Sequence, residues 1–389
     1  MNKLLEPVAL MSVALAGVIV FGIGHLVADI VAWDGDALEQ FGGIATDSHT
    51  ILTGVLLIAG FVAVVNQPEP APFASWPTAA LTDRWRTDPR GQMEALLTAF
   101  FAVGVLKTVL AFLDEVADEF DGAVRIVLHD TVFLFAIGGF GLTLTAVAAA
   151  GIGREWAGAS RARDVVSIAL ILTPLLGVIL ALMWFIEIQE FSGPLAFERA
   201  AFVLLEVVVA FSMLVVADAI VRGLHPPTDD TGVTLPDAYA GVVRDPVALL
   251  EKAVPAAALL GGAHAFFGLL YYAEFGADDV LWHLGDAGLH TAIALGLILA
   301  ARVAAKTSFA ALLEPSDGPN PYAEPLRLAT LIALAGGIVA AVFGFLAWQD
   351  VETSKGLYFL FNRLTRTAII VGVLAGLGAL HRPSEVTAS

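Results

Sequence analysis

Two pairs of segments decide the fold predicted for this chain of 389 residues. The first pair is GHLVADIVAW (24–33) and TDSHTILTGVLLIAG (46–60), and the second is AHAFFGLLYY (263–272) and DAGLHTAIALGLILAA (286–301). In each pair, two successive apolar segments carry one histidine each, so that His25 and His49 have counterparts in His264 and His290. This similarity predicts an internal repeat whose unit is a pair of helices.

The composition predicts an integral membrane protein. Hydrophobic residues make up 58% of the chain and charged residues only 15%, and the mean hydropathy is +0.81. A helix needs roughly 20 apolar residues to cross a hydrocarbon core of about 30 Å, and apolar segments of this kind recur along the whole sequence. Because these segments are continuous rather than alternating in polarity, we expect helices and not the strands of a membrane β-barrel.

We therefore predict an all-α, polytopic membrane helix bundle of about ten transmembrane helices in a single domain, residues 1–389. The predicted helices are Val8–Trp33, His49–Asn66, Ala95–Leu113, Ile126–Gly151, Val165–Ile186, Ala200–Val221, Ala253–Ala273, Ala287–Arg302, Leu328–Trp348 and Tyr358–Leu380. They group into five parallel hairpins, approximately 8–66, 95–151, 165–222, 253–302 and 328–380.

A nearly regular spacing along the chain supports the hairpin repeat. The second helices of the hairpins carry His49, His129, Glu206, His290 and Arg366. Their numbers in the sequence differ by 80, 77, 84 and 76 in turn, which gives a repeat of about eighty positions. The first helices carry His25, Lys107, Trp184, His264 and Trp348 at similar intervals. Each residue of the first set is expected near the outer end of its helix.

The basic residues predict the orientation. Most of the 20 lysine and arginine residues fall at the two termini and in the connections after every second helix, and this side is expected to be cytoplasmic in the cell membrane. The opposite connections are short and acidic. The net charge of −18 resembles the composition of proteins from halophilic archaea, and no nucleic acid partner is expected.

Ionisable residues inside the helices are the candidate functional residues. A charged side chain near the middle of a bilayer costs roughly 2.5 to 3.5 kcal/mol, so these residues should face the interior of the bundle. For Lys107 the candidate partners are Glu206, Asp130 and Glu187. The residues expected to line a pathway for a small ion or polar solute are His25, Asp29, His49, Lys107, His129, Glu206, His264, His290, Arg363 and Arg366.

Metal and haem sites are alternatives for the histidines. His25 and Asp29 share one helix face, and with His49 they are weak candidates for a divalent metal site. A haem b between two hairpins, for example between His25 and His290, would indicate an electron-transfer subunit. A third interpretation is a non-catalytic membrane scaffold or accessory subunit whose Gly-rich helices only pack together. The sequence contains no cysteine, which excludes thiol nucleophiles and thiolate metal sites, and no Walker or GxSxG motif, so ATP-driven transport within this chain is not expected. No catalytic residue is predicted, and we do not expect an enzyme.

Overall fold

The computed structural model describes residues 7–32, 37–65, 88–116, 120–151, 159–224, 246–306, 323–349 and 352–379, and all regular structure in these ranges is helical. The predicted all-α class is therefore confirmed. The ten described helices are α1 (Pro7–Ala32), α2 (Ala37–Val65), α4 (Pro89–Glu115), α5 (Phe120–Gly151), α6 (Ala159–Ile188), α7 (Gly193–Leu224), α9 (Pro246–Tyr272), α10 (Ala277–Lys306), α12 (Ala323–Gln349) and α13 (Thr353–Ala379). The Pro-rich connections 66–87, 225–245 and 307–322 lie outside the described residues.

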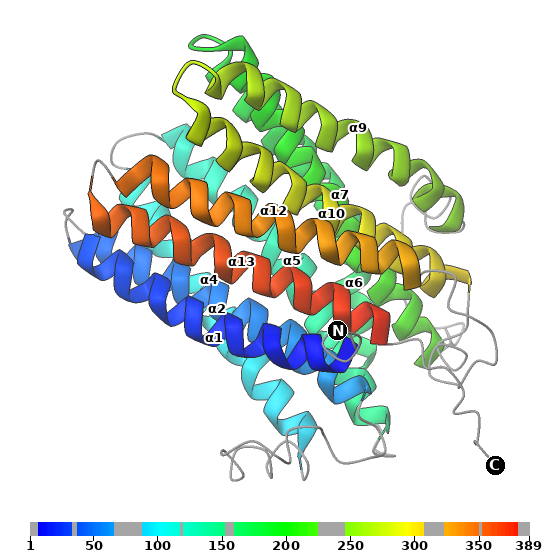
Figure 1. Ribbon diagram of the computed structural model, residues 1–389. Helices are drawn as coiled ribbons and strands as arrows, with labels where there is room; N and C mark the ends of the chain where they lie inside the picture. The colour runs from blue at the N-terminus through cyan, green and yellow to red at the C-terminus, as the bar shows by residue number, and fades with distance from the viewer. Residues whose placement is uncertain are drawn as a thin grey trace, which may run out of the picture.

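The helices run side by side in one bundle (Figure 1). Each described helix packs against the next one along the chain, and α13 returns to pack against α1, which closes the bundle. In addition, α2, α5, α7, α10 and α13 contact one another in turn: α2 with α5, α5 with α7, α7 with α10, α10 with α13 and α13 with α2. These five helices therefore form an inner group that encloses the centre of the bundle.

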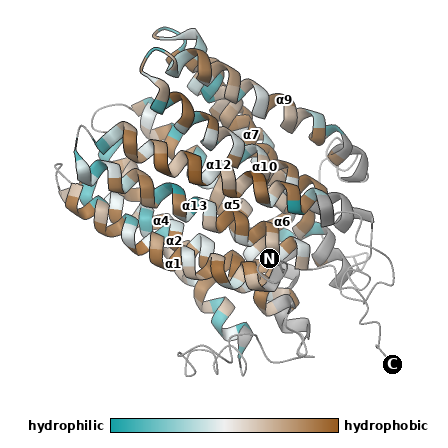
Figure 2. Cartoon of the chain, viewed as in Figure 1, coloured by the Kyte–Doolittle hydropathy of each residue, from teal (hydrophilic) through white to brown (hydrophobic). Residues whose placement is uncertain are grey.

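The other five helices, α1, α4, α6, α9 and α12, present large apolar side chains to the outside. On α1, for example, Val20, Ile23 and Val31 are exposed by 53% or more. Hydrophobic residues predominate along the visible helices (Figure 2). A soluble monomer rarely exposes so continuous an apolar surface, whereas a lipid bilayer would cover it. The fold is consistent with a multi-pass membrane protein.

Nine of the ten described helices are long and apolar enough to span a membrane, and α10 is the exception. The first half of α10 contains Asp278, Asp279, His283, Asp286 and His290. The prediction of about ten transmembrane helices therefore exceeds by one what length and composition support. A helix packed among α7, α9, α12 and α13 can carry polar groups because other helices, not lipid, contact them.

Several helices begin earlier than predicted, and this changes the position of their polar residues. Helix α2 begins at Ala37 rather than His49, and α10 at Ala277 rather than Ala287. His49 and His290 are therefore about 18 to 20 Å from the start of their helices, given a rise of about 1.5 Å per residue. The expectation that they lie near helix ends was wrong, because the polar first turns continue the helix instead of ending it.

Candidate functional site

A cavity of about 260 Å³ lies among the inner helices. All five of these helices contribute to its walls, together with α4. Its polar and ionisable lining residues are His49, Thr50, Thr53, Lys107, Thr108, His129, Asp130, Glu206, His290 and Arg366. The five residues that recur at nearly regular intervals in the sequence are thus brought together around one space, which we call the central cavity.

Lys107 and Asp130 form an ion pair at the wall of the central cavity. Lys107 Nζ donates to Asp130 Oδ1 at 2.6 Å, and the hydroxyl of Thr108 donates to the other carboxylate oxygen at 2.8 Å. Of the three partners considered for Lys107, Asp130 is the one in contact. Glu187 instead pairs with Arg125.

His129 lies between two carboxylates. Its Nδ1 is 3.4 Å from Asp130 Oδ1, and its Nε2 is 3.7 Å from Glu206 Oε2. Glu206, His129, Asp130 and Lys107 therefore form a continuous row of ionisable groups that crosses from α7 through α5 to α4. Such a row can bind a charged solute or pass protons between neighbouring groups.

The remaining polar lining residues differ in how well their hydrogen-bonding groups are satisfied. His49 stacks on Phe100 with ring centroids 4.7 Å apart, and its buried Nε2 has no hydrogen-bond partner. His290 Nδ1 donates to the backbone carbonyl of Asp286 at 2.9 Å. Arg366 is exposed although it lies near the middle of α13, because its side chain faces the central cavity.

Further toward the C-terminal end of each inner helix, apolar side chains line the same cavity. Seven or eight positions further along each helix, about two turns, the lining residues are Leu57, Ile137, Met213, Leu297 and Val373. The central cavity therefore has a polar end and an apolar end. A region lined by apolar side chains in this way disfavours water and ions.

His25 and Asp29 do not line the central cavity. His25 Nδ1 lies 3.1 Å from Asp47 Oδ1, and its Nε2 faces the amide of Asn362 at 3.1 Å. Asp29 instead lines a second cavity of about 450 Å³ near the ends of α1, α2 and α12. The structure thus does not bring His25, Asp29 and His49 together, so these three residues do not form the metal site suggested by their spacing. His25 and His290, the pair considered for haem, have different partners: His25 contacts Asp47 and Asn362, whereas His290 lines the central cavity.

Arg363 is also outside the central cavity. Its Nη1 donates to Asp286 Oδ1 at 2.6 Å, and its guanidinium lies 5.3 Å from the centre of the Trp282 ring. Both side chains of the ion pair are 11% exposed, so this contact ties α13 to α10 in the interior.

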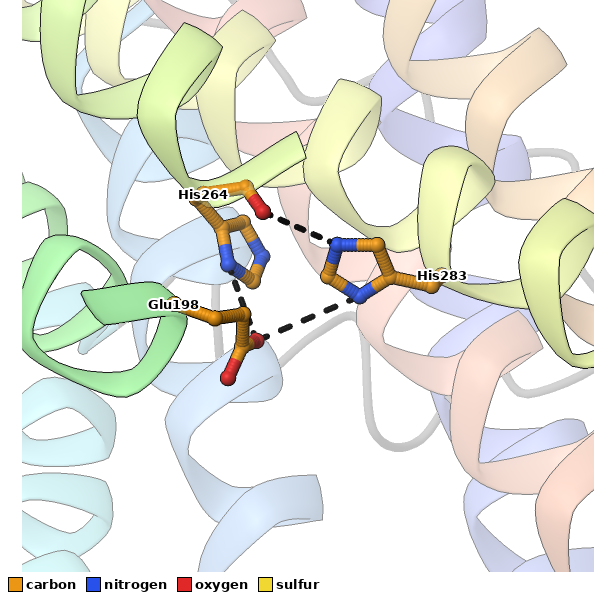
Figure 3. Close-up of side chains that lie close together, drawn as sticks. All are labelled: Glu198, His264 and His283. Atoms are coloured by element: carbon orange, nitrogen blue, oxygen red, sulfur yellow. Dashed lines mark hydrogen bonds and ion pairs between the residues drawn. The ribbon is translucent and has the colours of Figure 1, made fainter. Parts of the chain in front are cut away.

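A third cluster contains His264 and two residues that the sequence interpretation missed, Glu198 and His283 (Figure 3). His264 Nδ1 is 3.0 Å and His283 Nδ1 is 3.9 Å from Glu198 Oε1. We call these three residues the Glu198 cluster. A sequence signal for His283 did exist, because it precedes His290 by two helical turns and so lies on a similar face of the same helix. No such pattern marks Glu198.

Comparison with known proteins does not assign these clusters. No protein-family model matches the chain, and neither a curated protein nor a solved structure matches it. The function must therefore be inferred from the chemistry of the residues themselves.

Proposed function

We propose that this protein binds or conducts a small ion or polar solute through the central cavity. The observation that carries the proposal is the gathering of ionisable side chains from every inner helix around one space. Several ionisable groups are less costly to hold in one wet cavity than in separate dry pairs, because each dry pair must offset its own desolvation. If the helices only had to pack together, placing ionisable groups around one space would add no stability to the bundle.

The volume of the central cavity limits the size of the solute. At about 260 Å³, the cavity is smaller than the roughly 300 to 1,000 Å³ of pockets that enclose drug-sized ligands. Lys107 and Arg366 supply positive charge, while Asp130 and Glu206 supply negative charge, so the lining has no dominant sign. These features favour a hydrated ion, a proton carried along the ionisable row, or a small polar molecule.

The proposal includes an architecture of five hairpins that enter the membrane from the same side, as repeats of about eighty positions in a single domain. The mutual contacts of α2, α5, α7, α10 and α13 support it, since these are the second helices of the five predicted pairs. We place both termini in the cytoplasm and the bundle in the cell membrane, on the basis of the basic residues of the sequence. The His129 end of α5 would then face outward.

The test is flux through the purified, full-length protein reconstituted into liposomes. Influx of protons, sodium, potassium and chloride would be followed separately with fluorescent indicators under an imposed gradient. We expect at least one of these fluxes to exceed that of protein-free liposomes and to fall several-fold in Glu206→Gln and Arg366→Leu. Glu190→Gln, which changes an exposed carboxylate in the α6–α7 turn, is the matched control and should behave as the wild type.

Two results would contradict the proposal. One is a wild-type flux of all four ions equal to that of empty liposomes, together with no binding of small polar solutes. The other is a flux that the two cavity variants leave unchanged. Either result would favour the scaffold interpretation, in which the polar residues only hold helices together.

A further inference from the structure

The Glu198 cluster brings together three side chains from three helices in a buried position. Glu198 is on α7, His264 on α9 and His283 on α10, and each side chain is at most 3% exposed. Each residue lies five to eight positions from the end of its helix, at the same end of the bundle, which corresponds to a depth of roughly 8 to 12 Å. The cluster is thus inside the bundle but within reach of one surface.

The hydrogen bond of His283 leaves a lone pair pointed at a carboxylate. His283 Nε2 lies 3.0 Å from the backbone carbonyl oxygen of His264, and a carbonyl can only accept, so Nε2 carries the proton. In the neutral ring, Nδ1 is then an acceptor, and it faces Glu198 Oε1 at 3.9 Å. Two acceptors that face each other in a buried site need a proton or a metal cation between them.

His264 also lacks hydrogen-bond partners that a bound cation would replace. Neither of its ring nitrogens makes a hydrogen bond, although its Nδ1 lies 3.0 Å from Glu198 Oε1. Glu198 Oε2 also accepts no hydrogen bond, although Arg199 Nε lies 3.3 Å from it as an ion-pair partner. Buried polar atoms without hydrogen bonds are rare in native proteins, and three of them in one cluster call for an explanation. A cation bound among these side chains gives Glu198 and both imidazoles a partner at once.

We propose that Glu198, His264 and His283 bind one divalent transition-metal ion. Metal–ligand bonds of about 2.1 Å at a tetrahedral angle place neighbouring ligand atoms about 3.4 Å apart. The two separations in the structure, 3.0 and 3.9 Å, lie on either side of this value. Imidazole ligands suit zinc, copper, iron and nickel, and the carboxylate supplies the negative charge that balances the ion.

The surroundings of the cluster fit a metal site. The carbonyl of His264 orients the His283 ring, as the outer partners of metal-binding histidines commonly do, and Arg199 Nε lies 3.3 Å from Glu198 Oε2. Tyr272 stacks on His283 with ring centroids 4.9 Å apart. Three protein ligands leave a fourth position for water or another small ligand, as in catalytic zinc sites.

Gly268 on α9 gives His283 the room to reach this position. A Cβ atom at residue 268 would collide with the His283 ring. The first predicted repeat has Asp29 at the corresponding place, so the two repeats differ here. By contrast, a Cβ at Gly262, on the same helix, would meet no atom within 4 Å.

The metal site is separate from the central cavity. Phe202 lies between them, with its ring centroid 5.0 Å from that of His264 and 4.8 Å from that of His290. Metal binding should therefore be retained when the cavity is altered by Glu206→Gln. This separation allows the two proposals to fail independently.

The test is titration of the purified, tag-free, full-length protein with Co²⁺ after treatment with a chelator. Co²⁺ bound by histidine and carboxylate at a four-coordinate site gives visible absorption bands, and competition with Zn²⁺ removes them. We expect one ion per chain in the wild type and in Glu206→Gln, and at least about tenfold weaker binding in His283→Ala and in Glu198→Gln. Gly268→Ala should weaken binding in the same way, whereas Gly262→Ala should bind as the wild type.

Thermal melts with and without Zn²⁺ distinguish a variant that folds without binding metal from one that fails to fold. Zn²⁺ should raise the Tm of the wild type and of Gly262→Ala, but not that of Gly268→Ala, which removes no ligand and leaves the chemistry of the cluster unchanged. The proposal is overturned if the wild type binds neither Co²⁺ nor Zn²⁺, or if His283→Ala and Gly268→Ala bind them as tightly as the wild type. In the first case a protonated imidazole supplies the cation, and the cluster is a buried ion pair.

Discussion

Lys107 Nζ and Asp130 Oδ1 are 2.6 Å apart and join α4 to α5 at the wall of the central cavity. The carboxylate is only 5% exposed and the ammonium 19%, so neither group is fully hydrated. Removing one partner of such a pair leaves the other charge without compensation, whereas replacing both partners by uncharged groups is often nearly neutral. The pair therefore allows a structural role to be separated from a role in solute binding.

Lys107→Met should lower the free energy of unfolding by about 3 kcal/mol, the lower end of the range for a buried pair broken from one side, because the cavity hydrates part of the site. The double variant Lys107→Met/Asp130→Asn should recover most of this loss. Thermal melts in detergent measure both effects. If the double variant recovers stability but not ion flux, one or both charges of the pair act on the solute. Equal melts for the single variant and the wild type would contradict the stabilising role of the pair.

The proposed orientation predicts which positions react with a membrane-impermeant thiol reagent. The chain has no cysteine, so single cysteines can be introduced without background labelling. Ala277→Cys, at the exposed start of α10, should be labelled in intact cells. Lys252→Cys, near the start of α9 at the other end of the same helix pair, should be labelled only after the cells are opened, and the reverse pattern would invert the orientation.

Gly285 should tolerate no side chain, because α10 and α12 approach each other there through their backbones. A Cβ at residue 285 would lie 2.6 Å from both the amide nitrogen of Ala340 and the carbonyl oxygen of Gly336. Gly285→Ala is expected to cost about 1 to 3 kcal/mol of stability by overpacking. Gly288→Ala, on the same helix, meets no atom within 4 Å and should leave the Tm unchanged or slightly raised. A similar Tm for both variants would contradict the close approach.

The apolar end of the central cavity should limit flux. Ile137→Ser places a hydroxyl among the apolar lining residues and should increase the basal flux of the conducted ion several-fold, because a polar group there makes water more stable at the apolar end of the cavity. Ile338→Ser, at a position on α12 that is 47% exposed on the outside of the bundle, is the control. Equal flux through both variants would show that the apolar end of the cavity does not limit flux.

The helical class could be predicted from the sequence because it depends on local properties of the chain. Long apolar segments cannot cross a membrane except as helices or closed barrels, so hydropathy alone leaves few alternatives. The five residues spaced nearly regularly from His49 to Arg366 all line the central cavity, while their part in a solute pathway stays a prediction. Polar helix ends such as 37–48 were missed because hydropathy does not distinguish a helix that continues in a protein environment from one that has ended.

The choice of partners was decided only by the tertiary structure. Sequence spacing placed Asp29 beside His25, but Asp29 lines the second cavity, and Asp47 from the next helix contacts His25 instead. The Glu198 cluster depends on three separate helices, and on a glycine whose missing side chain admits His283. Local periodicity determines which residues share a helix face, whereas the rotation and approach of neighbouring helices, set by packing across the whole bundle, determine which faces meet.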